Sequence, residues 1–133
     1  CETLWRSPAA HIGETSLPEE VLLFDCLTLW VSGCLMDLED SMADQGVPHS
    51  AMLDAMVMSR LGELLAALRD RPGPAIIVSN ELGMGLVPPT TAGRHFRDLA
   101  GSANQLAAQQ ADCAIFIVSG LPLVLKGALP GIV

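Results

Sequence analysis

The 133-residue sequence has few basic side chains and no long uninterrupted apolar run. Lysine and arginine together number 7, against 15 aspartate and glutamate residues, so the formal net charge is −8. Binding to nucleic acid or to an anionic membrane draws on a basic surface, so this charge balance argues against both partners. No apolar stretch approaches the roughly 18 residues of a transmembrane helix, and no basic start leads into an apolar run as in a signal peptide.

Cysteine is present, but not in the pairs that bind zinc. The sequence contains no CxxC pair, which argues against a zinc site. Cys26 and Cys34 would lie about 12 Å apart along one helix, too far for a disulfide. We therefore expect reduced, buried thiols in a cytoplasmic protein. The four cysteines are Cys1, Cys26, Cys34 and Cys113.

Two catalytic signatures are absent as well. The sequence has no GxSxG elbow and no Ser-His-Asp constellation. No histidine stands at the end of an expected strand, so we expect all of them at the surface rather than in nucleophilic or acid–base roles. The histidines are His11, His49 and His95.

The sequence also lacks the GxxxxGK(S/T) motif of P-loop nucleotide enzymes. Its single lysine, Lys126, stands between Leu125 and Gly127. P-loop enzymes need the motif because its backbone amides cradle the phosphates and its lysine neutralises them. If the protein has a P-loop site, we expect the phosphate-binding half to lie outside this sequence.

What remains is typical of one α/β domain over residues 1–133, since half of the residues are hydrophobic. Short apolar runs predict strands buried on both faces of a parallel sheet, and apolar stripes at helical spacing predict helices. The order strand, helix, helix, strand, helix, strand, strand favours a mostly parallel sheet flanked by helices. Pro122 would confine the last strand to an edge. The strands are expected at 21–24, 75–78, 114–118 and 121–125, and the helices over 27–38, 53–68 and 96–107.

Polar residues follow each expected parallel strand. Asp25 ends the first, Ser79, Asn80 and Glu81 end the second, and 119–120 (Ser-Gly) ends the third. Ligands of such folds bind beyond the carboxyl ends of the strands, so we expect the site there. In P-loop enzymes an aspartate like Asp25 lies near the magnesium ion, but an aspartate also suits a turn, and spacing alone leaves both interpretations open.

A glycine-rich segment, Gly83 to Pro88, follows the second strand and is similar to the start of a dinucleotide-binding fingerprint. The third glycine is replaced by Pro88, and no acidic residue ends a strand about 20 residues later. A GxG pair alone is a weak signal, so a small dinucleotide-binding domain remains an alternative rather than the main interpretation.

Longer motifs carry a more specific signal. Residues 78–88 (VSNELGMGLVP), 94–105 (RHFRDLAGSANQ) and 24–30 (FDCLTLW) resemble the bifunctional adenosylcobinamide kinase / adenosylcobinamide-phosphate guanylyltransferase family of cobalamin synthesis. The endings 119–122 and 125–127 fit as well, so the resemblance covers most of residues 19–127.

The resemblance implies a P-loop NTPase fold of the RecA-like type and a homotrimer. It implies a transferase that phosphorylates the aminopropanol hydroxyl of adenosylcobinamide with ATP or GTP. The enzyme then transfers GMP from GTP to that phosphate through a GMP–histidine intermediate, giving adenosylcobinamide-GDP and pyrophosphate. Mg²⁺ is required. The expected partners are therefore adenosylcobinamide and its phosphate, with no nucleic acid and no membrane.

Carried over by position, the resemblance implies a nucleotide site with four residues of this sequence. Asp25 matches an acidic strand end beside the nucleotide, with a role in holding the metal. Glu2 matches a glutamate that contacts the guanine nucleotide, and Asn80 and Glu81 match the strand-end motif.

The resemblance also identifies what this sequence does not contain. The family's P-loop and its guanylylated histidine precede the segment that Glu2 matches, so the expected fold lacks its first strand and P-loop. His11 follows Glu2 and cannot take that histidine's role, so we assign no catalytic residue. We expect the chain alone to be an inactive, N-terminally truncated portion. The alternative is a non-catalytic module for binding or oligomer contacts.

Overall fold

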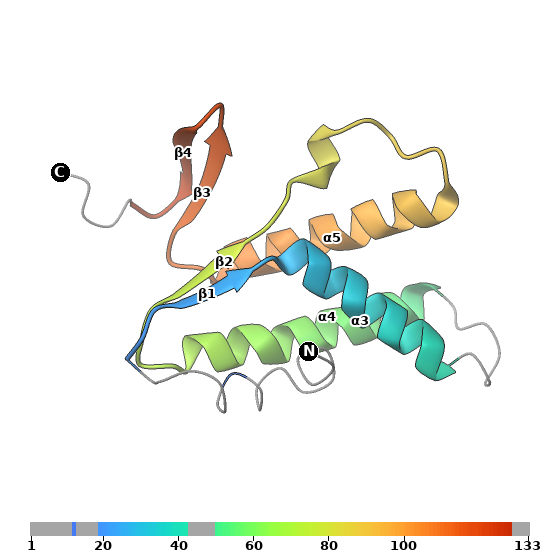
Figure 1. Ribbon diagram of the computed structural model, residues 1–133, viewed down its shortest axis with the longest axis horizontal. Helices are drawn as coiled ribbons and strands as arrows, with labels where there is room; N and C mark the ends of the chain where they lie inside the picture. Colours follow the sequence, from blue (N-terminus) through green and yellow to red (C-terminus); the bar gives the residue numbers. More distant parts are fainter. Residues whose placement is uncertain (1–11, 13–18, 43–49, 129–133) are drawn as a thin grey trace.

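The computed structural model describes residue 12, residues 19–42 and residues 50–128. It is an α/β structure in which parallel strands alternate with helices, as the sequence predicts (Figure 1). The helical and strand segments agree closely with the expected ones. In chain order they are β1 (Leu22–Asp25), α3 (Leu27–Met42), α4 (Ser50–Arg69), β2 (Ala75–Val78), the short 3-10 helix η2 (Leu82–Met84), α5 (Thr91–Gln110), β3 (Ala114–Val118) and β4 (Leu121–Lys126).

The first two strands form a parallel pair, with Leu22 opposite Ala75 and Asp25 opposite Val78. Their carboxyl ends therefore meet at one edge of the sheet, as parallel pairing requires. β1 ends in Asp25 and β2 is followed by Ser79, so the pairing brings the chain around Asp25 next to the segment that begins at Ser79.

The core lies between this pair and the helices. Residues at helical spacing on α3 and α4 are fully enclosed, among them Trp30, Val31 and Leu61. Leu99 and Ala103 add the inner face of α5, and no charged or polar residue of the described chain is buried. The amphipathic stripes of the sequence thus fold together as one apolar cluster, which is the main stabilising feature of the domain.

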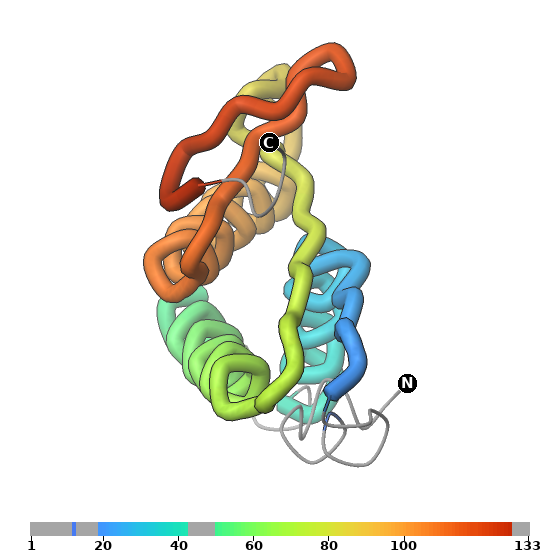
Figure 2. Tube along the Cα trace, turned by 90° about the vertical axis from the view of Figure 1, so that its left-hand side faces the viewer, coloured from blue at the N-terminus to red at the C-terminus, as the bar shows by residue number. Residues whose placement is uncertain are grey.

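The β1–β2 pair is covered on one face only, which corrects the prediction that its strands are buried on both. Phe24 faces the helices and is 8% exposed, whereas Leu23 and Ile76 on the other face are 62% and 52% exposed. Figure 2 shows α4 and α5 on one side of the pair and no described helix on the other. Side chains alternate across a strand, so helices on a single face leave every second apolar residue in solvent.

The third strand does not join this sheet, which corrects the prediction of one mostly parallel sheet. β3 pairs antiparallel with β4, and the described residues contain no ladder between β3 and β2. Ser119 and Gly120 make a two-residue turn with φ of 52° and 78°. Positive φ at both turn positions matches the twist of a hairpin, so the chain reverses here. The hairpin projects away from β1–β2 in both views (Figures 1 and 2).

The fourth strand is an edge strand, as Pro122 predicts. Within the described residues β4 pairs with β3 alone, and Pro122 lies opposite Ile117. Every residue of β4 is exposed. Among the described helices, none combines the length and the apolarity needed to cross a bilayer.

Candidate functional site

A hydrogen-bonded cluster of polar side chains lies at the carboxyl ends of β1 and β2. The hydroxyls of Thr28 and Ser79 are 3.4 Å apart, and the backbone N–H of Asn80 donates to Thr28 Oγ1 at 3.0 Å. Thr28 belongs to the first turn of α3, so these contacts join the β1–α3 connection to the end of β2. These polar groups therefore gather at the carboxyl ends of the strands, where the sequence predicts a site.

Asn104 ties the same cluster to α5. Its amide group accepts a hydrogen bond from Ser79 Oγ at 2.6 Å and donates from Nδ2 to the carbonyl of Asn80 at 3.0 Å. Three separate segments are therefore held at one point. We call Thr28, Ser79, Asn80 and Asn104 the strand-end cluster.

Asp25 ends β1 beside this cluster and has an exposed carboxylate. Mg²⁺ at nucleotide sites is held by one or two carboxylates, with phosphate oxygens and water as its other ligands. A single exposed carboxylate at this edge fits that mode of binding. No group of three or more His, Cys, Asp or Glu side chains in the described residues gathers into a metal-binding set.

The cluster uses the backbone of Asn80 rather than its side-chain amide. Its Oδ1 is 3.9 Å from the Cys26 thiol, a weak interaction, while its backbone groups make the two bonds that fix the cluster. Asn80 is exposed, so a ligand at the strand ends can reach its amide.

Glu81 has a local structural role. It precedes η2, and its Oε1 accepts a hydrogen bond from the backbone N–H of Gly83 at 2.9 Å. A Cβ at residue 83 would stand 2.8 Å from that oxygen, so a side chain there would displace the Glu81 carboxylate from this position. The first glycine of the GxG segment thus belongs to a capped 3-10 turn.

Two further predicted positions have different outcomes. The 119–120 segment is not brought to the strand-end cluster, because it forms the turn of the β3–β4 hairpin. The expectation that it joins the site was therefore wrong. Glu2 lies outside the described residues, as do His11 and His49.

His95 is half-buried rather than simply at the surface. Its Nε2 lies 2.6 Å from Asp54 Oδ1, an interaction that links α5 to α4. Because the pair joins two helices of the core, its position indicates a structural contact.

The expectation of buried thiols is confirmed for Cys34 only, because Cys26 and Cys113 are partly exposed. Cys26, Cys34 and Cys113 form no disulfide with one another. Burial raises the pKa of the Cys34 thiol to about 11, and the nearby Arg60 opposes part of that effect. Cys34 is therefore a protonated core side chain at neutral pH rather than a nucleophile.

A polar groove of about 400 Å³ runs between η2 and α5, next to the strand-end cluster. Glu81 and Gly83 line one wall. The other wall is a face of α5, since its residues recur at helical spacing. We call it the η2–α5 groove; its α5 residues are Arg97, Asp98, Gly101, Ser102 and Gln105.

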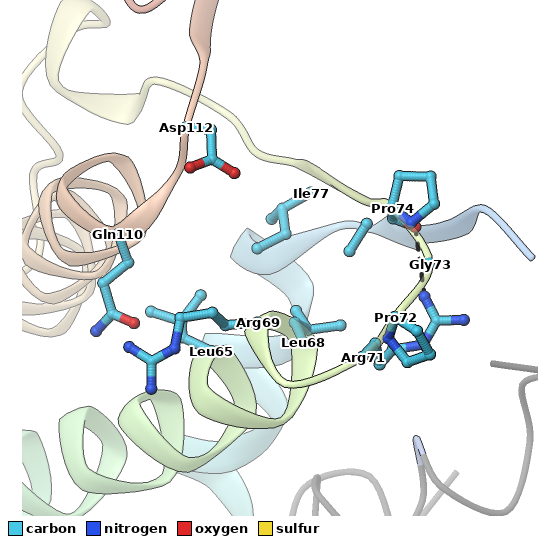
Figure 3. Close-up of a pocket in the computed structure, with 11 residues that line it drawn as sticks. Leu65, Leu68, Arg69, Arg71, Pro72, Gly73, Pro74, Ile77, Gln110 and Asp112 are labelled. Carbon is cyan, nitrogen blue, oxygen red and sulfur yellow. Dashed lines mark hydrogen bonds between the residues drawn. The ribbon is translucent and has the colours of Figure 1, made fainter. Parts of the chain in front are cut away.

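A second cavity of about 430 Å³ lies at the opposite end of the strands (Figure 3). Leu65, Leu68 and Ile77 form its apolar wall beside β2. Arg71, which lines its rim, donates to the backbone carbonyls of Pro74 and Glu20 at 3.3 and 3.0 Å. That guanidinium holds the entry into β1 and β2 together, so we do not regard this cavity as the functional site.

Two residues of the cluster, Thr28 and Asn104, are not among the sequence-predicted site residues. A polar residue on an amphipathic helix is expected to face solvent. The sequence around Asn104 does not predict that its side chain contacts the end of β2. A signal was present, since Asn104 lies within the 94–105 motif and Thr28 within 24–30.

Comparison with known proteins gives consistent matches. A family model described as cobinamide kinase / cobinamide phosphate guanyltransferase matches residues 5–125. The bifunctional adenosylcobalamin biosynthesis protein CobU of Escherichia coli is 36% identical over 109 residues, covering 82% of this chain and 60% of that protein. CobU of Salmonella typhimurium is 33% identical over 122 residues, covering 92% and 67%. CobP of Pseudomonas aeruginosa is 40% identical over 106 residues, covering 80% and 53%. The chain thus spans 53–67% of the length of these relatives.

Proposed function

The chain belongs to the cobinamide kinase / cobinamide phosphate guanyltransferase family, and from this premise we propose that it contributes to a bifunctional transferase of cobalamin synthesis. The first reaction moves a phosphoryl group from ATP or GTP to the hydroxyl of adenosylcobinamide and releases the nucleoside diphosphate. The second joins GMP from GTP to that phosphate and releases pyrophosphate. The histidine that carries GMP between these steps, as the resemblance implies, is not assigned to any residue of this chain.

The observation that carries this proposal is the strand-end cluster beside Asp25. Parallel strands bring an exposed carboxylate, the Asn80 amide and the hydroxyls of Thr28 and Ser79 to one edge. This is where ligands of open α/β sheets bind. Asn104 fixes the cluster to α5, so the groups that meet the ligand are set before it arrives.

We assign Asp25 the role of holding Mg²⁺ at the nucleotide phosphates. The bound ion would neutralise charge on those phosphates during transfer. Asn80 and Glu81 would contact the nucleotide from the end of β2, Glu81 through its backbone, since its carboxylate maintains the η2 cap and faces the η2–α5 groove. Glu2 would contact the guanine nucleotide, a role that rests on the resemblance alone.

We propose that the protein which holds the complete site has a P-loop NTPase fold of the RecA-like type. The 133-residue sequence has no GxxxxGK(S/T) motif, so the phosphate-cradling amides and lysine must come from other residues. We therefore propose that the isolated chain does not catalyse either transfer. A non-catalytic module, the alternative that the sequence leaves open, would bind corrinoid or a partner copy without turnover.

We also propose a homotrimeric, cytoplasmic protein. The exposed apolar side chains of β1–β2 and of the hairpin support association with further polypeptide, since monomers rarely leave large apolar patches in water. The reduced cysteines support the location. Light scattering during gel filtration of the complete gene product should give a trimer mass, and a monomer would contradict the assembly.

The activity is tested with the complete gene product and with the 133-residue chain in parallel. Each is incubated with adenosylcobinamide, GTP and Mg²⁺, and products are identified by mass spectrometry. We expect adenosylcobinamide phosphate and adenosylcobinamide-GDP from the complete product and neither from the chain. No product from the complete protein would overturn the proposed function, and turnover by the chain alone would overturn the requirement for other residues.

A further inference from the structure

We propose that the η2–α5 groove binds the carboxamide side chains of the corrinoid substrate, and that it does not bind the nucleotide. The proposal rests on the proposed function for the identity of the substrate. Apart from Glu81, the residues that line this groove have no role in the nucleotide site proposed above.

The groove is formed by elements that the hydrogen bonds hold in place. Arg94 donates to the carbonyls of Pro88 and Pro89, both at 3.0 Å, and so fixes the segment between η2 and α5. Thr90 caps α5 by accepting from the N–H of Gly93 at 3.1 Å. The two walls are therefore set by local contacts, and the groove is present before a ligand binds.

The charge of the groove disfavours a nucleoside triphosphate. Arg97 is the single cation among its lining residues, and two carboxylates, Glu81 and Asp98, accompany it. The Nε of Arg97 also lies 3.6 Å from Asp98 Oδ1, so its charge is partly offset. A polyanion placed here would meet net negative charge, whereas a ligand without negative charge would not.

The same side chains suit primary carboxamides. A carboxamide has two N–H donors and a carbonyl acceptor. The carboxylates of Glu81 and Asp98 can accept the donors, and the Arg97 guanidinium and the Gln105 amide can donate to the carbonyl. Cobinamide carries carboxamides around the rim of its corrin ring, so this donor and acceptor set matches its periphery.

The position of the groove also fits. Glu81 follows Asn80, and Gln105 follows Asn104, so the groove and the strand-end cluster are built from consecutive residues. A corrinoid held by its amides in the groove would have part of its rim next to the proposed phosphate site. That arrangement is needed to bring the substrate hydroxyl to the nucleotide.

Gly101 offers a direct test of the groove. It lines the groove, and a Cβ at this position would meet no atom within 4 Å. A side chain can therefore begin at residue 101 without a clash at its Cβ, and Gly101→Leu would extend it into the groove. Gly62 on α4 is a matched control, because a Cβ there also meets nothing within 4 Å and the residue does not line the groove.

The experiment measures steady-state kinetics of the complete gene product with each substrate varied in turn. We expect Gly101→Leu to raise the KM for adenosylcobinamide about tenfold or more, the factor for one or two lost hydrogen bonds, with the KM for GTP changed less than about twofold. Gln105→Ala should act in the same direction. Gly62→Leu should change neither constant, and circular dichroism melting should confirm that all variants fold.

The outcomes separate the two proposals. An increase in the KM for GTP alone would assign the groove to the nucleotide and overturn the inference. Unchanged constants in both groove variants would also overturn it. Loss of activity in the unsubstituted protein would contradict the proposed function instead, and dicyanocobinamide titrated by calorimetry would then still test the groove, with weaker binding to Gly101→Leu expected.

Discussion

The parallel pair β1–β2 and the hairpin β3–β4 are built from similar apolar residues but have different surroundings. Phe24 in β1 packs against the helices, and the polar end of β2 is hydrogen-bonded to Asn104 of α5. The hairpin has no fully buried residue, and all of β4 is exposed. An apolar strand therefore contributes to the core only where a helix face covers it, and its sequence alone does not say whether one does.

The largest expected effect comes from truncating one leucine in the helical core and one in the hairpin. Leu61 is 0% exposed, so Leu61→Ala should lower the free energy of unfolding by about 2–5 kcal/mol. Leu121 is 71% exposed, so Leu121→Ala should cost about 0.5 kcal/mol or less. Urea unfolding curves measure both, and equal losses would break the contrast between the two regions.

A smaller effect is expected at the base of the hairpin. Gly127 has φ of 71°, and a Cβ there would collide with the carbonyl of Asp112. Gly127→Ala should therefore cost about 1–3 kcal/mol. Gly120 in the turn has φ of 78° but open space around it, so Gly120→Ala should cost about 1 kcal/mol from backbone strain alone.

Hydrogen exchange of the Gly127→Ala variant would show which strands lose stability. We expect faster exchange in β3–β4 and unchanged exchange in β1–β2, because the two strand pairs share no ladder in the described residues. Equal acceleration in both pairs would mean that they unfold as one unit and would contradict the separation.

A loss of stability smaller than that of Leu61→Ala should come from removing the Asn104 side chain. Asn104→Ala removes its bonds to Ser79 Oγ and to the Asn80 carbonyl, and we expect a loss of about 1 kcal/mol because the cluster is partly solvated. Faster exchange should appear at the end of β2. Gln109→Ala, an exposed residue on the same helix, should leave that exchange unchanged.

Much of the local structure follows from the sequence. The periodicity of 27–38 and 53–68 predicts α3 and α4, and the apolar runs predict all four strands. Pairing of the strands was predicted less well. The run 114–118 has the composition of a parallel core strand, but the positive φ values at Ser119 and Gly120 turn it into a hairpin. A strand's apolar run does not encode its partner, whereas a two-residue turn does.

The candidate site likewise has features that the sequence predicts and features that it does not. The rule that carboxyl ends of parallel strands gather predicts that Asp25 and Asn80 share one edge, and the β1–β2 register confirms it. The contribution of Asn104 depends on how α5 packs across β2, which is a tertiary contact without a local signature. Glu81 illustrates the converse, because its hydrogen bond to Gly83 gives it a structural role that a motif alone does not reveal.

The central claim, that the carboxyl edge of β1–β2 is a nucleotide and metal site, is tested most directly at Asp25. Asp25→Asn in the complete gene product keeps the side-chain shape and removes the charge, while Asp40→Asn makes the same change on an exposed part of α3. We expect Asp25→Asn to lower kcat for phosphoryl transfer about 100-fold or more and to raise the Mg²⁺ concentration needed for half-maximal rate. Asp40→Asn should leave both unchanged. Full activity of Asp25→Asn with an unchanged Mg²⁺ requirement would contradict the account.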